Sequence, residues 1–254
     1  MIVQYASDLH IEFAQNSLYL HQNPIKAFGD ILILAGDIGY WDQRIFDLSF
    51  FDDLSKKFQF VYYLPGNHEF YTNKDIKVLR KPVCEQIRKN IHIVSDVVIN
   101  VADTDFIFTP LWSEVPPTKI MSIQQGVADF EKIKYRGKQF NVFDHNNLHK
   151  RSMDFLTKAV KASDAKNKVV VTHFVPTRMC NSEEYNKSEL NDYFVEELYD
   201  FIEDSDIDYW IYGHHHYNSP MVQIGNTKIV TNQLGYVHRN EYNCYQNAAY
   251  FEFK

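Results

Sequence analysis

The chain has only three cysteines among its 254 residues, Cys84, Cys180 and Cys244. Their odd number, their wide spacing and the lack of any CxxC pair argue against a disulfide framework or a cysteine-based zinc site. We therefore expect reduced thiols, which are typical of a reducing compartment such as the cytoplasm.

Long hydrophobic runs are also missing. No stretch approaches the roughly 20 consecutive apolar residues that a membrane-spanning helix needs. The first residues, 1–6, already have the pattern of a strand, with no basic segment and no long apolar run before them, so no signal peptide is predicted. The sequence therefore predicts a cytoplasmic protein without a membrane partner.

The chain lacks an excess of positive charge, because 33 acidic residues outnumber 26 basic ones and give a formal net charge of −7. Stable, non-specific nucleic-acid binding relies on lysine and arginine, so this balance argues against it. A phosphate substrate stays compatible with the charge, since bound divalent cations would reverse the sign of the local field. The length and the 45% hydrophobic content suit one globular domain over residues 1–254.

Short apolar runs alternate with helical patterns in the first part of the chain. Strands are predicted over 2–6, 30–35 and 60–64, and helices over 43–57 and 75–90. Further strands are predicted over 91–94, 97–101, 105–110, 168–172, 208–212, 221–224, 227–231 and 248–253, and further helices over 147–162 and 190–203. This order favours an α/β fold in which two mixed sheets pack as a sandwich flanked by helices. The irregular segment 112–145, which is rich in aromatic residues, is expected to be an insertion or lid.

Five polar clusters each follow a predicted strand. They are Asp8-Leu9-His10, Gly36-Asp37, Gly66-Asn67-His68-Glu69, Thr172-His173 and Gly213-His214-His215-His216. Because ligands bind at the carboxyl ends of strands in open α/β sheets, we expect these clusters to converge on one cleft. If each strand continues through its cluster, the two-residue spacing of Asp8 and His10, and of His214 and His216, places both members of a pair on one face.

The types of side chain in these clusters point to metal chemistry. Carboxylate, imidazole and amide groups without cysteine suit divalent Mn, Fe or Zn. A single carboxylate can bridge two such ions in binuclear phosphatases and nucleases.

Taken together and in this order, the five clusters resemble those of the calcineurin-like metallophosphoesterase superfamily. The resemblance extends from residue 8 to residue 216 and implies the two-sheet fold of that family. It also implies two metal sites that share Asp37 as a bridge. The first site would use Asp8, His10, Asp37 and His216, and the second would use Asp37, Asn67, His173 and His214.

The resemblance implies an enzyme that hydrolyses phosphate esters with a hydroxide bridging two metal ions, with Mn favoured for activity. His68 is not expected to bind metal; by resemblance it stabilises the transition state or protonates the leaving oxygen. Asn67 and His68 would also contact the substrate, and His145, in the irregular segment, is a further candidate for substrate binding.

The substrate class follows from what the clusters lack. The phosphoprotein phosphatases of this superfamily carry one arginine shortly after the second cluster and another before the third, and this chain has neither at those places. The sequence therefore favours small phosphodiesters, with a phosphomonoesterase acting on nucleotides or proteins as the alternative. A DNA-processing nuclease and a non-catalytic scaffold of the same fold are weaker alternatives. The sequence does not determine the oligomeric state.

Overall fold

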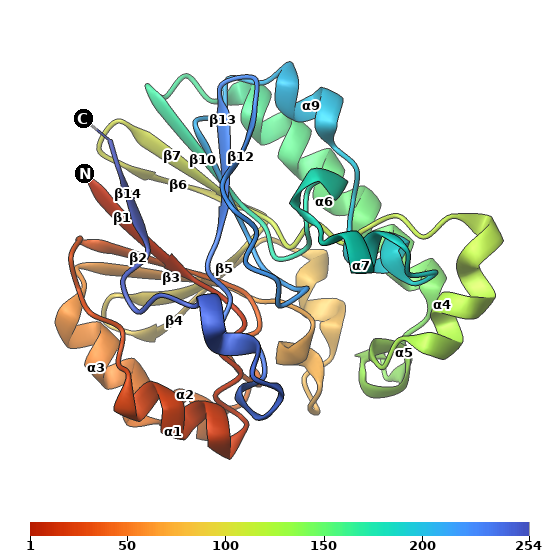
Figure 1. Ribbon diagram of the computed structural model, residues 1–254, viewed down its shortest axis with the longest axis horizontal. Helices are drawn as coiled ribbons and strands as arrows, with labels where there is room; N and C mark the ends of the chain where they lie inside the picture. The colour runs from red at the N-terminus through yellow and green to blue at the C-terminus, as the bar shows by residue number, and fades with distance from the viewer. Residues whose placement is uncertain (254) are drawn as a thin grey trace.

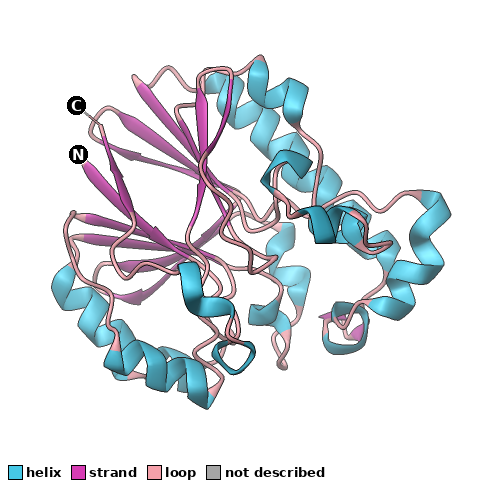
Figure 2. Ribbon diagram, in the orientation of Figure 1, coloured by secondary structure: helices cyan, strands magenta, loops and turns pink. Residues whose placement is uncertain are grey.

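The computed structural model describes residues 1–253. Two six-stranded sheets form its centre, and helices cover their outer faces (Figures 1 and 2). The strands of the first sheet, in sheet order, are β14 (Tyr250–Glu252), β1 (Ile2–Ala6), β2 (Ile31–Ala35), β3 (Phe60–Leu64), β5 (Ile91–Ser95) and β4 (Val83–Arg88). β1, β2, β3 and β5 are parallel, while β14 and β4 pair antiparallel at the two edges.

The second sheet has the same plan. Its strands, in sheet order, are β12 (Val222–Ile224), β13 (Thr227–Thr231), β11 (Tyr209–Tyr212), β10 (Asn167–Val171), β7 (Thr104–Phe108) and β6 (Val97–Val101). The four inner strands are parallel and the edge strands β12 and β6 are antiparallel. Both sheets are thus mixed, which confirms the predicted sandwich.

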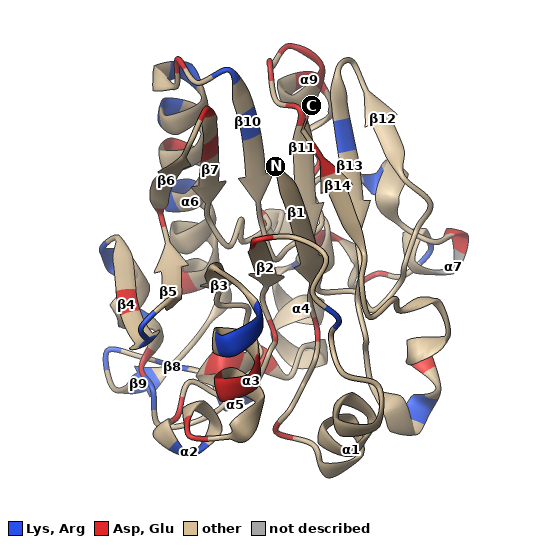
Figure 3. Cartoon of the chain, turned by 90° about the vertical axis from the view of Figure 1, so that its left-hand side faces the viewer, with Lys and Arg blue, Asp and Glu red and all other residues tan. Residues whose placement is uncertain are grey.

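The apolar runs of the inner strands reflect burial on both faces. Along β2, Ile31 and Ile33 pack between the sheets, against residues such as Val169 of β10. Leu32 and Leu34 point the other way and pack beneath the helices of the first sheet. A strand enclosed in this way has no polar face, so its sequence is continuously apolar. In Figure 3 the charged residues lie mainly on helices and loops, and most of each strand is uncharged.

Helices α1 (Ala14–Gln22), α2 (Gln43–Phe46) and α3 (Ser49–Lys57) lie beside the first sheet. Helices α6 (Val142–Ala162) and α9 (Tyr199–Glu203) cover the second sheet through apolar residues such as Leu156 and Ile202 (Figure 1). Short 3₁₀ turns complete the chain as η1 (His68–Phe70), η2 (Ile76–Arg80), η3 (Pro117–Lys119), η4 (Arg178–Cys180), η5 (Val237–Arg239) and η6 (Glu241–Cys244). Within residues 1–253, no helix has both the length and the apolar character needed to cross a bilayer.

The segment 112–145 extends away from the two sheets (Figure 1). It contains η3, α4 (Ile120–Gly126), α5 (Asp129–Lys132) and a small hairpin of β8 (Lys134–Tyr135) and β9 (Lys138–Gln139). Its aromatic side chains Trp112, Phe130 and Phe140 are buried. They belong to the same buried cluster as Phe174 and Tyr193, so the segment is packed onto the rest of the protein.

Three of the predicted helices differ from the structure, and the first of them, 43–57, is divided into α2 and α3. The helix predicted over 75–90 is wrong, because this stretch forms η2 and then the edge strand β4. Pro82 lies between them, and a proline inside a helix removes a hydrogen bond and clashes with the preceding turn. The helix predicted over 190–203 is divided into α8 (Asn191–Phe194) and α9, with Val195 extended and bridged to Val175. A further short helix, α7 (Glu183–Asn186), precedes them.

Candidate metal centre

Five parallel strands deliver the polar clusters to one place. β1, β2 and β3 end in the first sheet, and β10 and β11 end in the second, so the carboxyl ends of both sheets meet. In the part of the chain that the structure describes, three groups of side chains have potential ligand atoms that all lie within 4.8 Å of one another, and two of these groups consist of residues predicted as metal ligands. One group is Asp8, His10 and His216, and the other is Asp37, His173 and His214.

The side chains are aimed by backbone that is unusual for their residue types. Asp8, His10, Asp37, His214 and His216 all have positive φ angles, between 48° and 85°. Non-glycine residues in this left-handed region cost free energy and gather at functional sites. The prediction that strand alternation orients the two pairs is wrong, since β1 and β11 end before either pair begins. Left-handed turns after the strands orient them instead.

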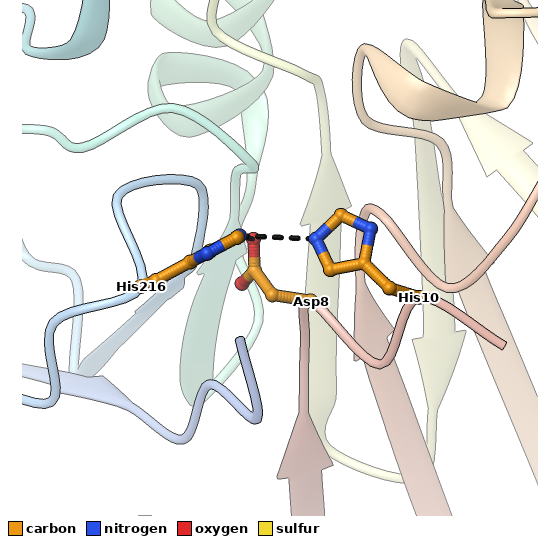
Figure 4. Close-up of side chains that lie close together, drawn as sticks. All are labelled: Asp8, His10 and His216. Atoms are coloured by element: carbon orange, nitrogen blue, oxygen red, sulfur yellow. Dashed lines mark hydrogen bonds and ion pairs between the residues drawn. The ribbon is translucent and has the colours of Figure 1, made fainter. Parts of the chain in front are cut away.

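The first group joins the two sheets. The His10 Nε2 lies 3.0 Å from the His216 Nε2, and the Asp8 Oδ1 lies 3.5 Å from that same nitrogen. Figure 4 shows Asp8 and His10 approaching from one side and His216 from the other. Burial lowers the pKa of His10 and keeps its imidazole neutral. A neutral imidazole offers a nitrogen lone pair, which is what a metal ion binds.

The second group surrounds the ring of His173. Its Nε2 lies 3.1 Å from the Asn67 Oδ1, 3.2 Å from the His214 Nδ1 and 3.3 Å from the Asp37 Oδ1. The other oxygen of Asp37, Oδ2, lies 4.0 Å from the His10 Nε2. The carboxylate of Asp37 therefore stands between the two groups, with one oxygen towards each.

The electrostatics of this centre favour a cation. Burial opposes ionisation of Asp37, but His173, His68 and His10 together outweigh it and hold the pKa of this carboxyl well below its ordinary value. Burial lowers the pKa of His173, yet Asp37 raises it to about 10. The buried carboxylate thus retains a positive charge beside it, and a metal ion binding here would take the place of that proton.

Two glycines allow the strand ends to approach so closely. A Cβ atom on Gly66 would lie 2.2 Å from the Asp37 Oδ1, and one on Gly36 would lie 2.2 Å from the His173 Nδ1. Real Cβ contacts almost never fall below 3.0 Å, so any side chain at either position would displace a group of the centre. Gly36 also has a φ of +91°, which glycine adopts without strain.

Further polar groups hold the candidate ligands in place. The His216 Nδ1 lies 2.6 Å from the Glu241 Oε2, and the His173 Nδ1 lies 3.0 Å from the carbonyl oxygen of Ala35. Each contact turns the Nε2 of its ring towards the centre, as carboxylates and carbonyls do for metal-binding histidines. The carboxylate of Glu69 accepts hydrogen bonds from the backbone N–H groups of residues 37, 38 and 66, so it fastens the ends of β2 and β3 together.

His68 lies beside the centre and is held by a residue that the sequence reasoning missed. The Glu12 Oε1 lies 3.1 Å from the Nδ1 of His68 and 3.1 Å from the Nδ1 of His10. The other ring nitrogen of His68 lies 3.2 Å from the Tyr236 hydroxyl. Burial lowers the pKa of His68, but Asp37 and Glu12 raise it to about 9. The ring is therefore in its positively charged imidazolium form near neutral pH. The only sign of this role in the sequence is that Glu12 stands two residues after His10.

A cavity of about 380 Å³ opens over the centre. Its floor includes Asp37, Asn67, His68, His214 and His216. One wall comes from the α4–α5 region and the segment around α7 and α8, and the other from Tyr236, Arg239 and Glu241.

His145 was predicted to contact the substrate, and the structure places it elsewhere. Its side chain is fully buried and is not among the residues that line the cavity. The rings of Trp112, Phe130, Phe174 and Tyr193 surround it. Burial lowers the pKa of His145 to about 3, which keeps the ring neutral. The position of His145 on α6 points it inwards, into the core beneath the cavity.

The sandwich of two mixed sheets and the polar centre at their shared edge define an α/β protein with a candidate metal centre. Residues 5–218 match the calcineurin-like phosphoesterase family, and the chain belongs to that family. Members typically bind divalent metals, and the family and fold support a metal-dependent phosphoesterase. The predicted resemblance is thereby confirmed.

One curated protein is similar to this chain in sequence, and solved structures are similar to it in fold. Protein L509 of Acanthamoeba polyphaga mimivirus is 31% identical over 96% of this chain and 95% of its own. The phosphopantetheinyl hydrolase of Mycobacterium tuberculosis has a similar fold, with a TM-score of 0.69, 17% identity and coverage of 98% of this chain and 95% of its own. A dimetal phosphatase from Danio rerio has a TM-score of 0.52 and 11% identity, over 92% of this chain and 87% of its own.

Proposed function

We propose that this chain hydrolyses small phosphodiesters with two divalent metal ions that share Asp37. The position of Asp37 carries the proposal, because its two carboxylate oxygens face the two groups of potential ligands. The proposed first site consists of Asp8, His10, Asp37 and His216, and the proposed second site consists of Asp37, Asn67, His173 and His214. Imidazole, carboxylate and amide ligands fit Mn, Fe or Zn, of which we favour Mn for activity.

The metal ions, when bound, supply a water of lowered pKa and positive charge to offset that of the phosphate. The chain itself supplies the proton for the leaving group. His68 is protonated near neutral pH, lines the cavity and has its ring fixed by Glu12 and Tyr236. We infer that His68 contacts the phosphate or the leaving oxygen and donates its proton there. Asn67, which also lines the cavity, would lie against the same phosphate.

A preference for diesters rests on the scarcity of cationic side chains in the cavity. Arg239 is the only lysine or arginine among the residues that line it in the described chain, and its exposed guanidinium packs over the Tyr236 ring at the rim. A phosphomonoester dianion would gain from an arginine fork at the floor, whereas a diester carries one charge fewer. The name of the Mycobacterium protein, a phosphopantetheinyl hydrolase, is compatible with ester cleavage of this kind.

A phosphomonoesterase is the second candidate, and the dimetal phosphatase with the same fold favours it. The acidic net charge disfavours a DNA-processing nuclease. A non-catalytic scaffold is disfavoured because every potential ligand named above is present and lies at the centre.

Turnover of two model compounds tests the proposal. The metal-free protein is supplied with Mn²⁺, Fe²⁺ or Zn²⁺, and kcat/KM is compared for bis-p-nitrophenyl phosphate and p-nitrophenyl phosphate. We expect Mn²⁺-dependent turnover with a higher kcat/KM for the diester. Asp37→Ala should abolish it, while Asp53→Ala, which removes an exposed carboxylate on α3, should not. A higher kcat/KM for the monoester would favour the second candidate. No turnover with any of the metals, together with no bound metal, would contradict an enzyme.

A further inference from the structure

The carboxylate of Asp129 is contributed by the segment 112–145, and Asp129 is among the residues that line the cavity over the centre. Asp129 begins α5 and is 1% exposed. It accepts hydrogen bonds from the Asn67 Nδ2 at 3.0 Å and the Tyr71 hydroxyl at 2.5 Å on one oxygen, and from the Tyr193 hydroxyl on the other. No lysine, arginine or histidine is paired with it among the ion pairs of the described residues. Burial of a carboxylate that is satisfied only by neutral donors costs folding free energy. Such a residue is therefore a candidate for a functional role.

The contact with Asn67 determines which end of its amide faces the centre. The two ends of an asparagine amide have nearly the same shape, but only the oxygen can bind a metal ion. The Asn67 Nδ2 donates to the Asp129 Oδ1, so the NH₂ end of the amide faces Asp129. The Asn67 oxygen is thereby turned the other way, to 3.1 Å from the His173 Nε2.

The same carboxylate reaches His68 through a ring. The hydroxyl of Tyr71 is fixed by Asp129, and its ring stacks on the His68 ring with centroids 4.2 Å apart. On the opposite side, Tyr193 connects Asp129 to α8, which forms part of the cavity wall. Asp129 therefore joins three separate parts of the chain at one buried point, namely its own α5, the segment 67–71 and α8.

We propose that Asp129 is a positioning residue for the second metal site, which holds the Asn67 amide with its oxygen towards the metal ion. This inference rests on the proposed function and deepens it. It gives the segment 112–145 a role beyond that of a lid, because the segment supplies the group that orients a metal ligand. The first site, formed around Asp8 and His10, has no contact with Asp129 among the hydrogen bonds of the described residues.

Mn²⁺ binding to metal-free protein tests the inference without any substrate. His216→Ala leaves the second site as the intact one, and His214→Ala leaves the first. Mn²⁺ affinity is measured by calorimetry and by electron paramagnetic resonance in each background, with and without Asp129→Asn. An asparagine at 129 can donate as well as accept, so it no longer selects one end of the Asn67 amide. We expect the affinity of the second site to fall about 10–100-fold, as for other groups that orient metal ligands. The affinity of the first site should stay within about twofold.

Glu131→Gln is the matched control, because Glu131 is an exposed acid two residues along on α5. It should leave both affinities unchanged. Unchanged affinity of the second site in Asp129→Asn, or an equal loss at both sites, would overturn the inference. If Asp129→Asn fails to fold, Tyr193→Phe replaces it as the test variant. It removes one hydrogen-bond donor from the Asp129 carboxylate and should lower the Mn²⁺ affinity of the second site about fivefold. An unchanged second site in Tyr193→Phe would then overturn the inference. Absence of Mn²⁺ binding to the unmodified protein would overturn the metal centre itself, which is a distinct result.

Discussion

A methyl group added at residue 66 should disable the centre without disturbing the rest of the fold. Gly66 follows β3, and its Cβ position lies 2.2 Å from the Asp37 Oδ1 and 2.6 Å from the His173 Nε2. Gly66 is not among the residues with positive φ, so alanine can adopt its backbone conformation without strain. The effect of Gly66→Ala therefore comes from contact with two candidate ligands.

The size of the effect follows from these distances. Since Cβ contacts below 3.0 Å are essentially never observed, the Asp37 carboxylate must move by about 1 Å. A displacement of about 1 Å at reacting groups can cost about 100-fold in rate. Asp37 is shared between the two proposed sites, so both Mn²⁺ affinities should fall as well. We expect kcat to fall by at least about 100-fold.

The assay compares Gly66→Ala with Gly126→Ala. A Cβ on Gly126, at the end of α4, would meet only the flexible tip of Leu190 at 2.9 Å, and alanine suits a helix better than glycine. Diester turnover, Mn²⁺ affinity and thermal unfolding of the metal-free proteins are measured for both. Normal turnover and affinity in Gly66→Ala would refute the arrangement in which Asp37 and His173 converge against this glycine.

Three further predictions concern protonation and metal binding. Glu12→Gln should lower kcat about 100-fold for diesters with poor leaving groups but only slightly for p-nitrophenyl esters, whose leaving group needs no proton; equal losses for both would contradict a proton donated by His68. The free energy of unfolding, measured with denaturant, should decrease as the pH is lowered from about 6.5 to 3. His145 contributes about 1.4 kcal/mol per pH unit to this decrease, because in that range the unfolded state binds a proton at His145 that the folded state does not. His145→Phe should lose that part of the slope, and an unchanged slope would contradict the assignment. Adding Mn²⁺ at about 100 times its Kd should raise the free energy of unfolding of the metal-free protein by about 2.7 kcal/mol and its Tm by about 5–10 °C, and an unchanged Tm would contradict binding to the folded state.

The strands and the candidate ligands could be predicted because both leave local patterns in the sequence. The run 31–35 is apolar throughout since both its faces are buried, and Gly36 and Asp37 follow it directly. Parallel strands then bring such clusters to one edge whatever the loops between them do. The edge strand β4 gave no such pattern, because residues 84–86 are exposed and it alternates only weakly.

The residues that hold the ligands could not be predicted in the same way. Glu241 lies 25 residues from His216, and Asp129 lies 62 residues from Asn67, so only the tertiary fold brings either pair together. The left-handed backbone at Asp8 and at His10 was equally out of reach, since a spacing of two residues is the same in a strand and in a turn. His145 shows the converse. Its sequence position in the irregular segment suggested substrate contact, but α6 turns its side chain into the core.

The candidate ligands are spread along the chain from Asp8 to His216, and each proposed site takes groups from both sheets. During synthesis the first site therefore cannot form until His216 has left the ribosome, and the second cannot form until His214 has. A chain that stops before residue 214 would lack both His214 and His216 and could complete neither site. Retention of the metal ions would thus mark a chain in which β10 and β11 of the second sheet have come together with β1, β2 and β3 of the first.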